Sequence, residues 1–559
     1  MKTPFTAALR ALALVLLLAP FAVAHATSTK PVTPCVRYAP GLEIVAPTDL
    51  YSTNGILRVT LSYQSRVDTD GTVLYCYMTP DGIQSPTLHV KPGDELLITL
   101  TNNLPPSTNP SFRNHSMPGM DMNTPPPSLE IVKRGLQTCG GMVMTATSTN
   151  MHFHGTNVPP DCHQDEVIKT LVNSGETFQY DVHFPIDEPP GLYWYHPHIH
   201  GISEPAVQGG ATGAIIVDGI ENVNNEVAGM YYRELIVRDT VVPSNIDPDS
   251  DNLPAWNLSL NYSPITYPAY KVPVIPMKRG GSELWRVLNS AADTILDLQV
   301  LYDGVPQDLR IVAIDGVPTG SQDGTAVGTT LVAKHYRLPP AARVEFVIAA
   351  PDKTVKVAQL VTTNIDTGPF GDNDPDRPLA NIKSTGTTGD GSLKLPAATN
   401  SILKLPRFTG LAKAVPTVTR KLYFSEILSD PTDPNSPTNF FITVDGATPT
   451  LFDPNNPPAI VTTQGTTEDW IIENRALENH EFHIHQIHFL VLEQNGQPVD
   501  GQYQDMIDVP YWDGVGPYPS VKLRMDFRGN YVGDFVYHCH ILGHEDFGMM
   551  AVIRVLPAN

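Results

Sequence analysis

Histidine recurs at short, regular spacings in four places in the sequence. The clusters read "HFH" from His152, "HPH" from His196, "HEFHIH" from His480 and "HCHILGH" from His538. Alternate side chains of a β-strand point to the same face, so an H-x-H pair presents two imidazoles to one metal ion or to two adjacent ones. A single pair would also fit a solvated strand face. Ten of the 18 histidines fall in these four clusters, and this concentration predicts a shared metal centre.

A cysteine lies inside the last cluster and narrows the choice of metal. Cys539 stands between two histidines, and His544 and Met549 follow it. Imidazole binds zinc, copper, iron and nickel, but two histidines, a cysteine and a weak methionine are the ligands of a blue-copper electron-transfer site. Zinc favours four closed ligands, often with more cysteines. The pattern therefore indicates copper, with His480 as the second imidazole.

Three similar segments predict the strands that must position these clusters. Each carries an acidic residue before an apolar or alternating run that ends in asparagine: "GDELLITLTN" (93–102), "SELWRVLN" (282–289) and "TEDWIIEN" (467–474). Such runs are typical of β-strands. Proline (53 residues) and glycine (41 residues) are frequent, which favours short strands and turns over long helices. The predicted fold class is all-β.

A second repeat connects the first and last thirds of the chain. "WYHPHIHG" (194–201) resembles "VYHCHILG" (536–543), and each precedes a closing apolar strand. Repeats of this size predict three related β domains, which we place at 36–220, 225–400 and 405–559. The middle domain has "SAADTILDLQV" (290–300) where the last has "NHEFHIHQIHF" (479–489). We therefore expect the middle domain to be a metal-free spacer.

The first 26 residues have the order of a secretory signal. Lys2 and Arg10 come first, an apolar run follows, and Ala24-His25-Ala26 resembles a cleavage site. The alternative is a membrane anchor, but the apolar run is short and broken by proline. We expect export to the periplasm or the medium, with no membrane as partner. The net charge of −22, which becomes −24 without Lys2 and Arg10, disfavours nucleic acid and anionic lipid.

Four of the five cysteines lie in the first third of the chain. An oxidising compartment favours their pairing into two disulfides. Three pairings are open, and the sequence does not choose among them: the residues are Cys35, Cys76, Cys139 and Cys162. Cys539 is left over, which agrees with a role as a metal ligand.

The four clusters, in their order and with this chain length, resemble the multicopper oxidases, a family that includes laccases, bilirubin oxidase-like enzymes and bacterial copper-efflux oxidases. The resemblance covers essentially the whole mature chain. It implies three cupredoxin-like domains, each a Greek-key β-sandwich or barrel, and four copper ions: one type 1, one type 2 and two type 3. It also implies a laccase-like enzyme that takes single electrons from a small reducing substrate and reduces O2 to water.

Carried over residue by residue, the resemblance assigns the metal ligands. The type 1 copper would be held by His480, Cys539, His544 and the axial Met549. The type 2 copper would be held by His152 and His483. The type 3 pair would be held by two sets of three, namely His154, His196 and His540, and His198, His485 and His538. Four further histidines lie near the motifs but match no ligand position: His163, His183, His200 and His488.

Two carboxylates are candidate catalytic residues. Reduction of O2 to two waters takes four protons as well as four electrons, and carboxylates are natural proton shuttles. Glu545, in "HEDFGMM", matches an acid of the copper-efflux oxidases. Asp165, in "CHQDEVI", is our choice for the second acid, with Asp161 and Glu166 as its competitors. The alternative is that both are ordinary polar loop residues.

The sequence departs from the family pattern at three positions beside the ligands. Phe153 stands where tryptophan is usual, Glu481 where proline is usual and Gln486 where glycine is usual. The last domain lacks the long methionine-rich insertion of the copper-efflux oxidases, although "HSMPGMDM" (115–122) in the first domain holds three methionines. This favours phenols and aromatic amines as substrates over Cu(I). Cu(I), Fe(II) and bilirubin-like substrates are the alternatives.

Two other classes of function share part of this pattern. A copper-storage protein would not need ordered type 2 and type 3 ligand sets. A copper nitrite reductase-like enzyme shares the fold but usually has two domains per chain and assembles its catalytic copper between subunits. Here all four motifs can close within one chain, so we expect a monomer. Dioxygen uptake with a phenol, compared with nitrite reduction, separates these classes.

Overall fold

The computed structural model describes residues 33–106, 139–140, 143–242, 253–324, 327–386, 392–399, 406–433 and 436–558. The expected signal segment and the methionines of 115–122 lie outside these residues. Contacts divide the chain into Met1–Thr33 and Pro34–Asn559, and every element below belongs to the second unit. Within the described ranges, no helix has both the length and the apolar character needed to cross a bilayer.

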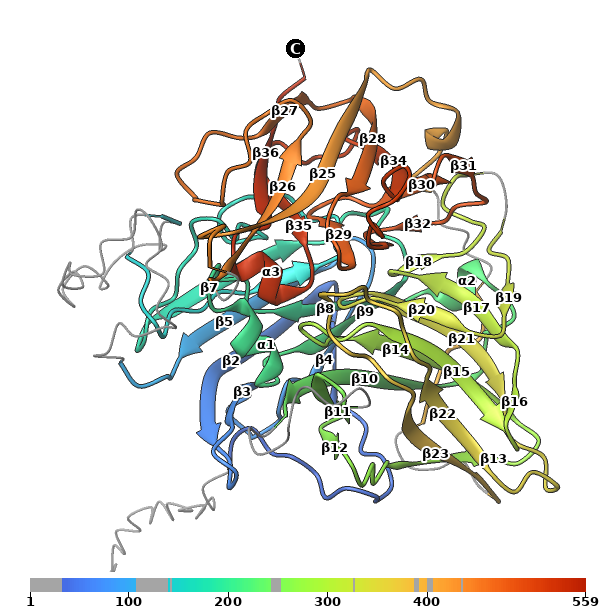
Figure 1. Cartoon of the computed structure of the whole chain (residues 1–559). Helices are drawn as coiled ribbons and strands as arrows, with labels where there is room; N and C mark the ends of the chain where they lie inside the picture. The colour runs from blue at the N-terminus through green and yellow to red at the C-terminus, as the bar shows by residue number, and fades with distance from the viewer. Residues whose placement is uncertain are drawn as a thin grey trace, which may run out of the picture. The chain divides into compact units, whose positions relative to one another are not determined.

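The first sandwich consists of a five-stranded and a four-stranded sheet (Figure 1). The five-stranded sheet has the order β1 (Asp49–Tyr51), β4 (Thr87–Val90), β9 (Gly213–Val217), β8 (Gly191–His196) and β6 (His152–His154). The four-stranded sheet has the order β3 (Val73–Met78), β2 (Ile56–Val67), β5 (Glu95–Asn102) and β7 (Thr177–His183). Alternate apolar side chains of both sheets form one core, which includes Leu88, Ile98 and Tyr180.

The second sandwich has a larger and a smaller sheet. The nine-stranded sheet runs through β12 (Ser263–Ile265), β11 (Trp256–Leu260), β10 (Tyr231–Val241), β14 (Ser282–Asn289), β21 (Arg343–Ala349), β17 (Leu309–Ile314) and β18 (Val317–Pro318), with β19 (Leu331–Ala333) and β24 (Leu393–Lys394) paired at its sides. The other sheet runs through β13 (Val274–Lys278), β23 (Arg377–Thr385), β22 (Ala358–Thr362), β15 (Leu296–Tyr302) and β16 (Val305–Pro306), with β20 (Tyr336–Leu338) on β15.

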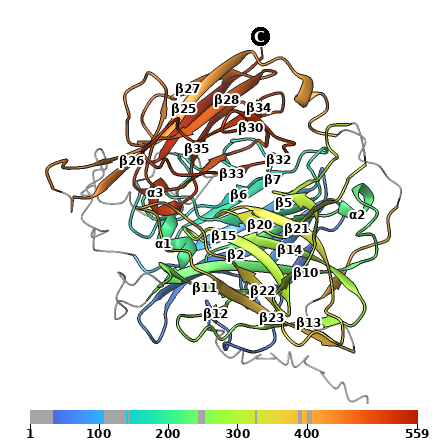
Figure 2. The same ribbon diagram turned by 45° about the vertical axis from the view of Figure 1, so that its right-hand side comes forward.

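The third sandwich, orange to red in Figures 1 and 2, has a seven-stranded and a five-stranded sheet. The first runs through β26 (Thr438–Val444), β25 (Val418–Leu428), β28 (Thr467–Asn474), β34 (Ser520–Asp526), β30 (Phe489–Gln494) and β31 (Gln497–Pro498), with β32 (Tyr503–Gln504) on β30. The second runs through β27 (Ile460–Thr463), β36 (Met550–Leu556), β35 (Gly533–Cys539), β29 (His480–Ile484) and β33 (Met506–Val509).

Helices are few and short in the described part of the chain. They are α1 (Ser203–Gln208), α2 (Ile220–Val223), the 3-10 turn η2 (Leu411–Lys413) and α3 (Leu542–Asp546). The predicted all-β fold with three β-sandwiches is confirmed. The boundaries at 36–220, 225–400 and 405–559 stay sequence predictions.

The three repeated segments form equivalent strands. Each lies between an earlier strand, to which it is parallel, and a later strand, to which it is antiparallel. Thus β5 lies between β2 and β7, β14 between β10 and β21, and β28 between β25 and β34. The acidic start and the apolar run that recur in the sequence therefore correspond to one position in three copies of the same sheet.

The asparagine that closes each repeat makes the same buried contacts three times. Its side-chain amide donates to two backbone carbonyls, at 2.6 and 2.8 Å from Asn102, 2.9 and 3.0 Å from Asn289, and 2.8 and 2.9 Å from Asn474. Its side-chain oxygen accepts a backbone N–H two residues later in every copy. Because buried backbone groups need partners, one asparagine joins three segments of each sandwich.

These asparagines also align the three copies. In each copy, the asparagine donates to the carbonyl of a residue that pairs with a neighbouring strand or bridge. These acceptors are Val172, Leu338 and Val509, and their pairing partners are Thr149, Leu296 and His480, which are therefore equivalent positions in the three copies. Three and five residues beyond these points lie His152 and His154 in the first copy, Gln299 and Leu301 in the second, and His483 and His485 in the third. The middle copy thus keeps the asparagine contacts and the strand pairing but has no histidine at the two equivalent positions.

Candidate metal centre

One group of candidate ligands lies where β29, β35 and α3 meet. The Cys539 sulfur is 3.6 Å from Nδ1 of His480 and 3.8 Å from Nδ1 of His544, and these two nitrogens are 3.1 Å apart. The three buried side chains could hold one metal ion. Met549 is buried in the same core cluster, and its carbonyl accepts the N–H of Cys539 at 3.1 Å. The structure therefore brings together the side chains of His480, Cys539 and His544, and it places the backbone of Met549, the fourth residue assigned to the type 1 position, beside Cys539.

The outer edges of the two imidazoles are held by carboxylates. Nε2 of His480 lies 3.0 Å from Glu426, and Nε2 of His544 lies 3.4 Å from Glu478. Phe440 stacks on His544 with ring centres 4.3 Å apart. The Nδ1 atoms are thereby directed at Cys539, and outer partners of this kind orient the rings of metal-binding histidines.

The cysteines support the same assignment. All five lie in the described residues, and the structure pairs Cys35 with Cys76 and Cys139 with Cys162. Cys539 is free and buried. Burial raises the pKa of its thiol and lowers the pKa of His544. A cation that binds a thiolate and neutral imidazoles fits this donor set, because metal binding releases the thiol proton.

A second, larger group contains eight buried histidines. They come from the paired strands β6 and β8 of the first sandwich, from β29 and β35 of the third, and from the residues directly after these strands: His152, His154, His196, His198, His483, His485, His538 and His540. The two sets of three assigned from the sequence have closely spaced rings, as have other triples such as His152, His154 and His196, whose centres are 5.3–5.7 Å apart. Ring centres are 5.0–5.7 Å apart among His154, His196 and His540, and 4.8–5.4 Å apart among His198, His485 and His538.

The eight rings have an approximate twofold arrangement that relates the first sandwich to the third. The twofold exchanges His152 with His483 and His196 with His538, because His152 pairs with His196 in the first sandwich as His483 pairs with His538 in the third. His152 stacks on His485 with centres 3.8 Å apart, and His154 stacks on His483 at 4.0 Å. The exchange also converts one set of three rings into the other. The sequence "YHxHI" therefore occurs twice because each copy supplies equivalent candidate ligands to one approximately symmetric site.

Several of these rings have nitrogen atoms without a hydrogen-bond partner in the described part of the chain. Buried nitrogens of this kind occur on His152, His154, His196, His483, His485 and His540. Leaving a buried polar atom without a partner costs about 1–3 kcal/mol, and a shared ligand would remove this cost for several nitrogens at once. Burial lowers the pKa of all eight imidazoles, which keeps them neutral and able to bind metal. Copper ions fit these donors.

Outer contacts fix which nitrogen faces the cluster. His196 and His538 each use Nδ1 to donate to the carbonyl of the next residue, at 2.8 Å in both copies. Nδ1 of His483 donates to the carbonyl of Asp505 at 2.9 Å. Their Nε2 atoms are therefore left for the centre, where Nε2 of His198 and of His538 are 3.3 Å apart.

Of the three acids considered after the first motif, Asp165 contacts a candidate ligand. Its Oδ1 lies 2.9 Å from Nδ1 of His152 and accepts the N–H of Phe153 at 2.9 Å. Asp161 is exposed and bonds to Gln164. Glu166 accepts N–H groups at positions 168 and 169 of its own loop. Glu545, the other sequence candidate, is fully buried on α3.

Asp505 and Arg343 were not found from the sequence. Both Asp505 oxygens accept hydrogen bonds from the Arg343 guanidinium at 2.6 Å, and Asp505 Oδ1 lies 3.4 Å from Nε2 of His154. All three side chains are buried. Gly155 makes room for this pair, because a Cβ there would lie 2.2 Å from Arg343 Nη2. Arg343 belongs to β21, so the middle sandwich contributes a cation beside the cluster although it contributes no histidine.

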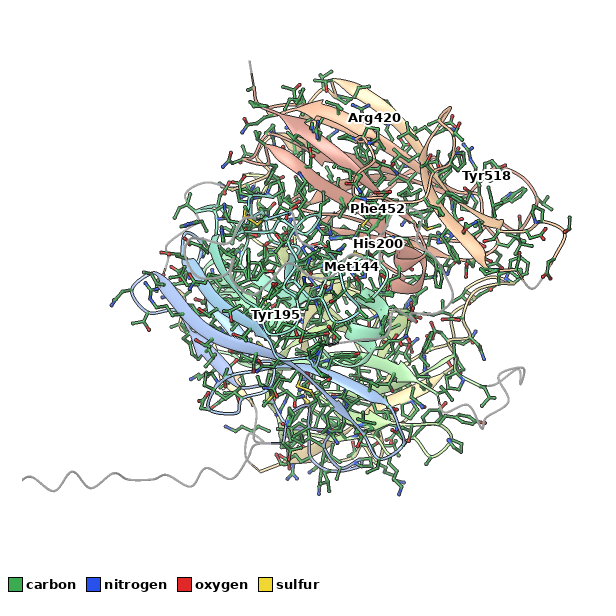
Figure 3. All side chains as sticks on the ribbon, turned by 90° about the vertical axis from the view of Figure 1, so that its left-hand side faces the viewer. Met144, Tyr195, His200, Arg420, Phe452 and Tyr518 are labelled. Carbon is green, nitrogen blue, oxygen red and sulfur yellow. A yellow bond between two sulfur atoms is a disulfide. The ribbon has the colours of Figure 1, made fainter. Side chains whose placement is uncertain are left out.

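The remaining histidines are placed as follows. His183 is exposed, and His163 donates from its ring to the carbonyl of Gln179. His200 packs edge-on against Phe452 with centres 4.8 Å apart (Figure 3). His488 is buried and donates to the carbonyl of Asp315 at 2.9 Å. None of the four belongs to the two groups of candidate ligands.

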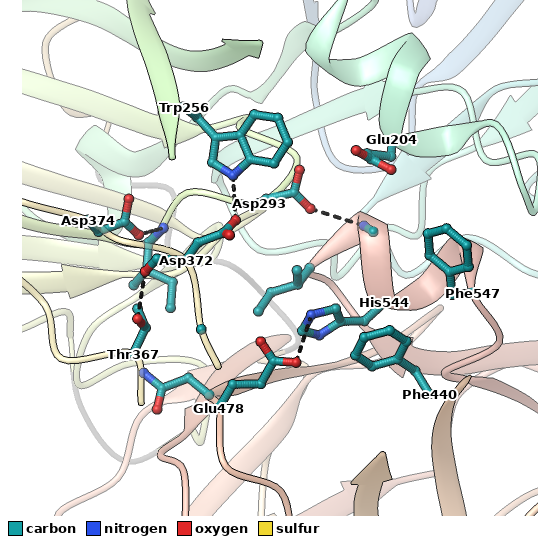
Figure 4. Close-up of a pocket in the computed structure, with 15 residues that line it drawn as sticks. Glu204, Trp256, Asp293, Thr367, Asp372, Asp374, Phe440, Glu478, His544 and Phe547 are labelled. Atoms are coloured by element: carbon teal, nitrogen blue, oxygen red, sulfur yellow. Dashed lines mark hydrogen bonds and ion pairs between the residues drawn. The ribbon is translucent and has the colours of Figure 1, made fainter. Parts of the chain in front are cut away.

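A recess of about 220 Å³ opens beside His544 (Figure 4). Its wall carries three aromatic rings, Trp256, Phe440 and Phe547, and five carboxyl groups, Glu204, Asp293, Asp372, Asp374 and Glu478. Burial raises the pKa of Asp374 to about 7 even though Arg377 lies beside it. The acids come from all three sandwiches, and no short sequence motif could have identified them as a group.

Comparisons with known proteins agree with this geometry. Residues 142–222 and 426–559 each match a family model described as "Multicopper oxidase". The laccase of Bacillus subtilis is 24% identical over 510 residues, covering 83% of this chain and 87% of that protein. The structure of a Campylobacter jejuni multicopper oxidase, titled a metallo-oxidase, superposes with a TM-score of 0.65 at 21% identity and covers 93% of this chain and 96% of that one. A multicopper oxidase from Aquifex aeolicus superposes with a TM-score of 0.62 at 18% identity, covering 92% and 99%.

Proposed function

We infer that this chain, which is a member of the multicopper oxidase family, holds four copper ions, one between Cys539 and its two histidines and three in the eight-histidine cluster. Bound copper supplies one-electron redox chemistry and the place where O2 is reduced to water. This inference rests mainly on one observation: strand β35 contributes residues both to the Cys539 group and to the eight-histidine group.

The ligand roles follow the sequence assignment. We propose His480, Cys539, His544 and Met549 for type 1, and His152 and His483 for type 2. The assignment of His154, His196 and His540 to one type 3 copper, and of His198, His485 and His538 to the other, follows the family resemblance, and the spacing of the rings is compatible with it. His152 and His483 are exchanged by the approximate twofold and belong to neither set of three, which agrees with a role as ligands to a single ion between two equivalent ones.

The chain itself provides the connection between the two sites. Because side chains alternate along β35, Cys539 faces one site while His538, and His540 just beyond the strand, face the other. The covalent path between the sites therefore consists of the Cys539 side chain, its backbone and a neighbouring imidazole. Electrons would enter at the edge of His544, which is the candidate ligand that lines the recess.

We propose Asp165 and Glu545 as the acids that move protons. Asp165 is supported by its contact with His152 and by its burial. Glu545 is supported by its place on α3, directly after His544, and by its burial. A carboxyl group can hold and release a proton where bulk water has little access.

For the substrate we propose a phenol or an aromatic amine, with the amine favoured. Aromatic rings line the recess at the edge of His544, and its five carboxyl groups can accept hydrogen bonds from an amine. Desolvation in the recess raises the pKa of Asp293, Asp372, Asp374 and Glu478, so the attraction for a protonated amine comes from those acids that are ionised at the working pH. A metal cation, Fe(II) or Cu(I), is the second candidate, because carboxylates also bind such ions. The metallo-oxidase from Campylobacter jejuni superposes on the same fold. A bilirubin-like substrate carries carboxylates and is disfavoured by this charge.

We also propose that the chain is exported and works as a monomer. The two disulfides support an oxidising compartment, in agreement with the charged and apolar order of the first 26 residues. Every candidate ligand comes from one chain, so no partner subunit is needed to complete either site.

Oxygen consumption tests the function directly. The purified copper-loaded protein would be given an aromatic amine, a neutral phenol, Fe(II) or Cu(I) in separate reactions, with nitrite as a separate acceptor under argon. We expect oxygen uptake with the amine and the phenol at one O2 per four electrons, and no turnover of nitrite. Full copper loading with no oxygen uptake from any donor would show a binding protein. Uptake with metal ions only would replace the aromatic substrate by the second candidate.

A further inference from the structure

Gln486 has a backbone conformation that is unusual for its residue type. It lies directly after His485, is buried, and has φ of +61°. Residues other than glycine seldom adopt this left-handed region, and those that do are commonly held there by their surroundings. The corresponding residue of the first sandwich, directly after His154, is Gly155 with φ of +81°. The chain thus uses the same turn twice but places a long side chain on only one copy.

The side chain of Gln486 reaches across to the first sandwich. Its amide donates to Asp165 Oδ2 at 2.6 Å, and the same nitrogen lies 3.4 Å from the Asp165 carbonyl. The other oxygen, Oδ1, accepts the N–H of Phe153 and faces Nδ1 of His152. The carboxylate is therefore fixed at both oxygens. Only one of its fixing groups, Gln486, comes from the third sandwich.

The second carboxylate beside the cluster is fixed by a different group. Asp505 is gripped by Arg343 of the middle sandwich, in space that Gly155 leaves open. At the twofold-related turn Gln486 stands in place of the glycine, and its own side chain donates the bond to Asp165. Each turn thus lies beside an acid that accepts a hydrogen bond next to the cluster. The donor is Arg343 of the middle sandwich for Asp505, and it is the turn residue Gln486 itself for Asp165.

We propose that Gln486 is a positioning residue for type 2 copper. It fixes the Asp165 carboxylate in the orientation that holds Nδ1 of His152, so that Nε2 of His152 faces the metal. Contacts of this kind beyond the ligands set both ligand orientation and metal affinity. The proposal rests on the proposed copper assignment, and it adds a residue that binds neither metal nor substrate.

The test uses Gln486→Gly, with Gln486→Asn as a second variant. Glycine accepts a positive φ without strain, and asparagine tolerates it but is one methylene too short to reach Asp165. Both variants should fold and show the native blue absorption of the type 1 site. We expect the type 2 copper to bind about 10- to 100-fold more weakly, measured by competition with a chelator, and its EPR signal to change shape.

Gln322→Gly is the matched control. Gln322 is also a buried glutamine with positive φ, +57°, and it lies in the middle sandwich, where its carbonyl accepts the N–H of Phe408. In the described part of the chain, no hydrogen bond joins it to a candidate ligand. Its replacement relieves the same backbone conformation and should leave the type 2 affinity and EPR signal as they are in the native protein.

A double variant tests whether Gln486 acts through Asp165. If it does, Gln486→Gly in an Asp165→Asn background should change the type 2 affinity by less than about twofold, because coupled residues give non-additive effects. The proposal is overturned if Gln486→Gly keeps native type 2 affinity, if its effect adds in full to that of Asp165→Asn, or if Gln322→Gly weakens the site equally. Absence of blue colour and of a type 2 signal in the native protein would instead overturn the copper assignment itself.

Discussion

His538 and Cys539 are consecutive residues of β35 whose side chains belong to two different sites. Nε2 of His538 lies 3.3 Å from Nε2 of both His198 and His485, whereas the Cys539 sulfur lies 3.6 Å from Nδ1 of His480. Strand alternation produces this division without any special backbone feature. Sites that must exchange electrons are thereby joined by one peptide unit.

Replacement of Cys539 by serine should separate the two sites functionally. We expect Cys539→Ser to lose the intense blue absorption and turnover with every donor, because the thiolate ligand, which is also the first atom of the covalent path to His538, is removed. Copper in the eight-histidine cluster should remain, as measured by metal content and by the type 2 EPR signal. Blue colour retained in this variant would contradict the assignment of Cys539 as a ligand.

Asp165→Asn should weaken the cluster without affecting the Cys539 site. Asparagine keeps the shape of the side chain but gives His152 a weaker acceptor, so type 2 copper affinity should fall about 10- to 100-fold. Chelator competition and EPR measure the effect. Glu166→Gln, one residue along the same loop, is the control and should behave as the native protein. Equal effects from both substitutions would indicate a general disturbance of the loop.

Glu545→Gln should slow the oxygen half-reaction alone. The amide cannot carry a proton, and losing a positioned acid or base typically costs about 10²–10⁴-fold in rate. Anaerobic reduction of the blue band by substrate should keep its native rate, whereas reoxidation by O2 in stopped flow should be slower by about that factor. A variant that is reduced slowly but reoxidised normally would place Glu545 on the electron path instead.

Asp372→Asn should discriminate between charged and neutral donors. Asp372 is an exposed residue that lines the recess and accepts the indole N–H of Trp256 at 2.5 Å. Loss of one exposed charge should raise KM for a cationic amine about two- to fivefold and leave KM for a neutral phenol unchanged. Asp376→Asn, in the same loop but outside the lining of the recess, is the control. An equal rise for both donors would mean that the charge of Asp372 does not select substrates.

His89 should make stability fall at alkaline pH. Burial lowers its pKa, but hydrogen bonds to Asp218 at 2.9 Å and Asp49 at 3.0 Å outweigh this and raise the pKa to about 9 from an ordinary 6.5. The protonated form is favoured in the folded state, so this stabilisation is complete below about pH 6.5 and is lost as pH rises towards 9. The shift corresponds to at most about 3 kcal/mol.

The measurement compares the native protein with His89→Gln. Denaturant unfolding at several pH values should show a difference in the free energy of unfolding that shrinks between pH 6.5 and 9. A difference that is constant over this window would show that His89 is not protonated in the folded protein.

The sequence could predict the fold and the two groups of candidate ligands because their signals are local. The asparagine-ended repeats occupy single strands, and each H-x-H pair lies in a strand or at its end, so short-range periodicity indicates where they lie. Arg343 and Asp505 are 162 residues apart and meet only after two sandwiches pack. The acids around His544 likewise come from three sandwiches. Gln486 was visible only as a departure from a family pattern, since its φ and its bond to Asp165 are properties of the folded chain.

The bond between Arg343 and Asp505 limits how far this enzyme can be shortened. A two-sandwich version would keep every proposed copper ligand, yet it would lose Arg343 and leave a buried carboxylate without its cation. Removing one partner of a buried ion pair costs about 3–5 kcal/mol, enough to cancel much of the stability of a small protein. A minimal oxidase built from this chain would therefore need a neutral side chain at position 505, and room at position 155 for whatever replaces the guanidinium.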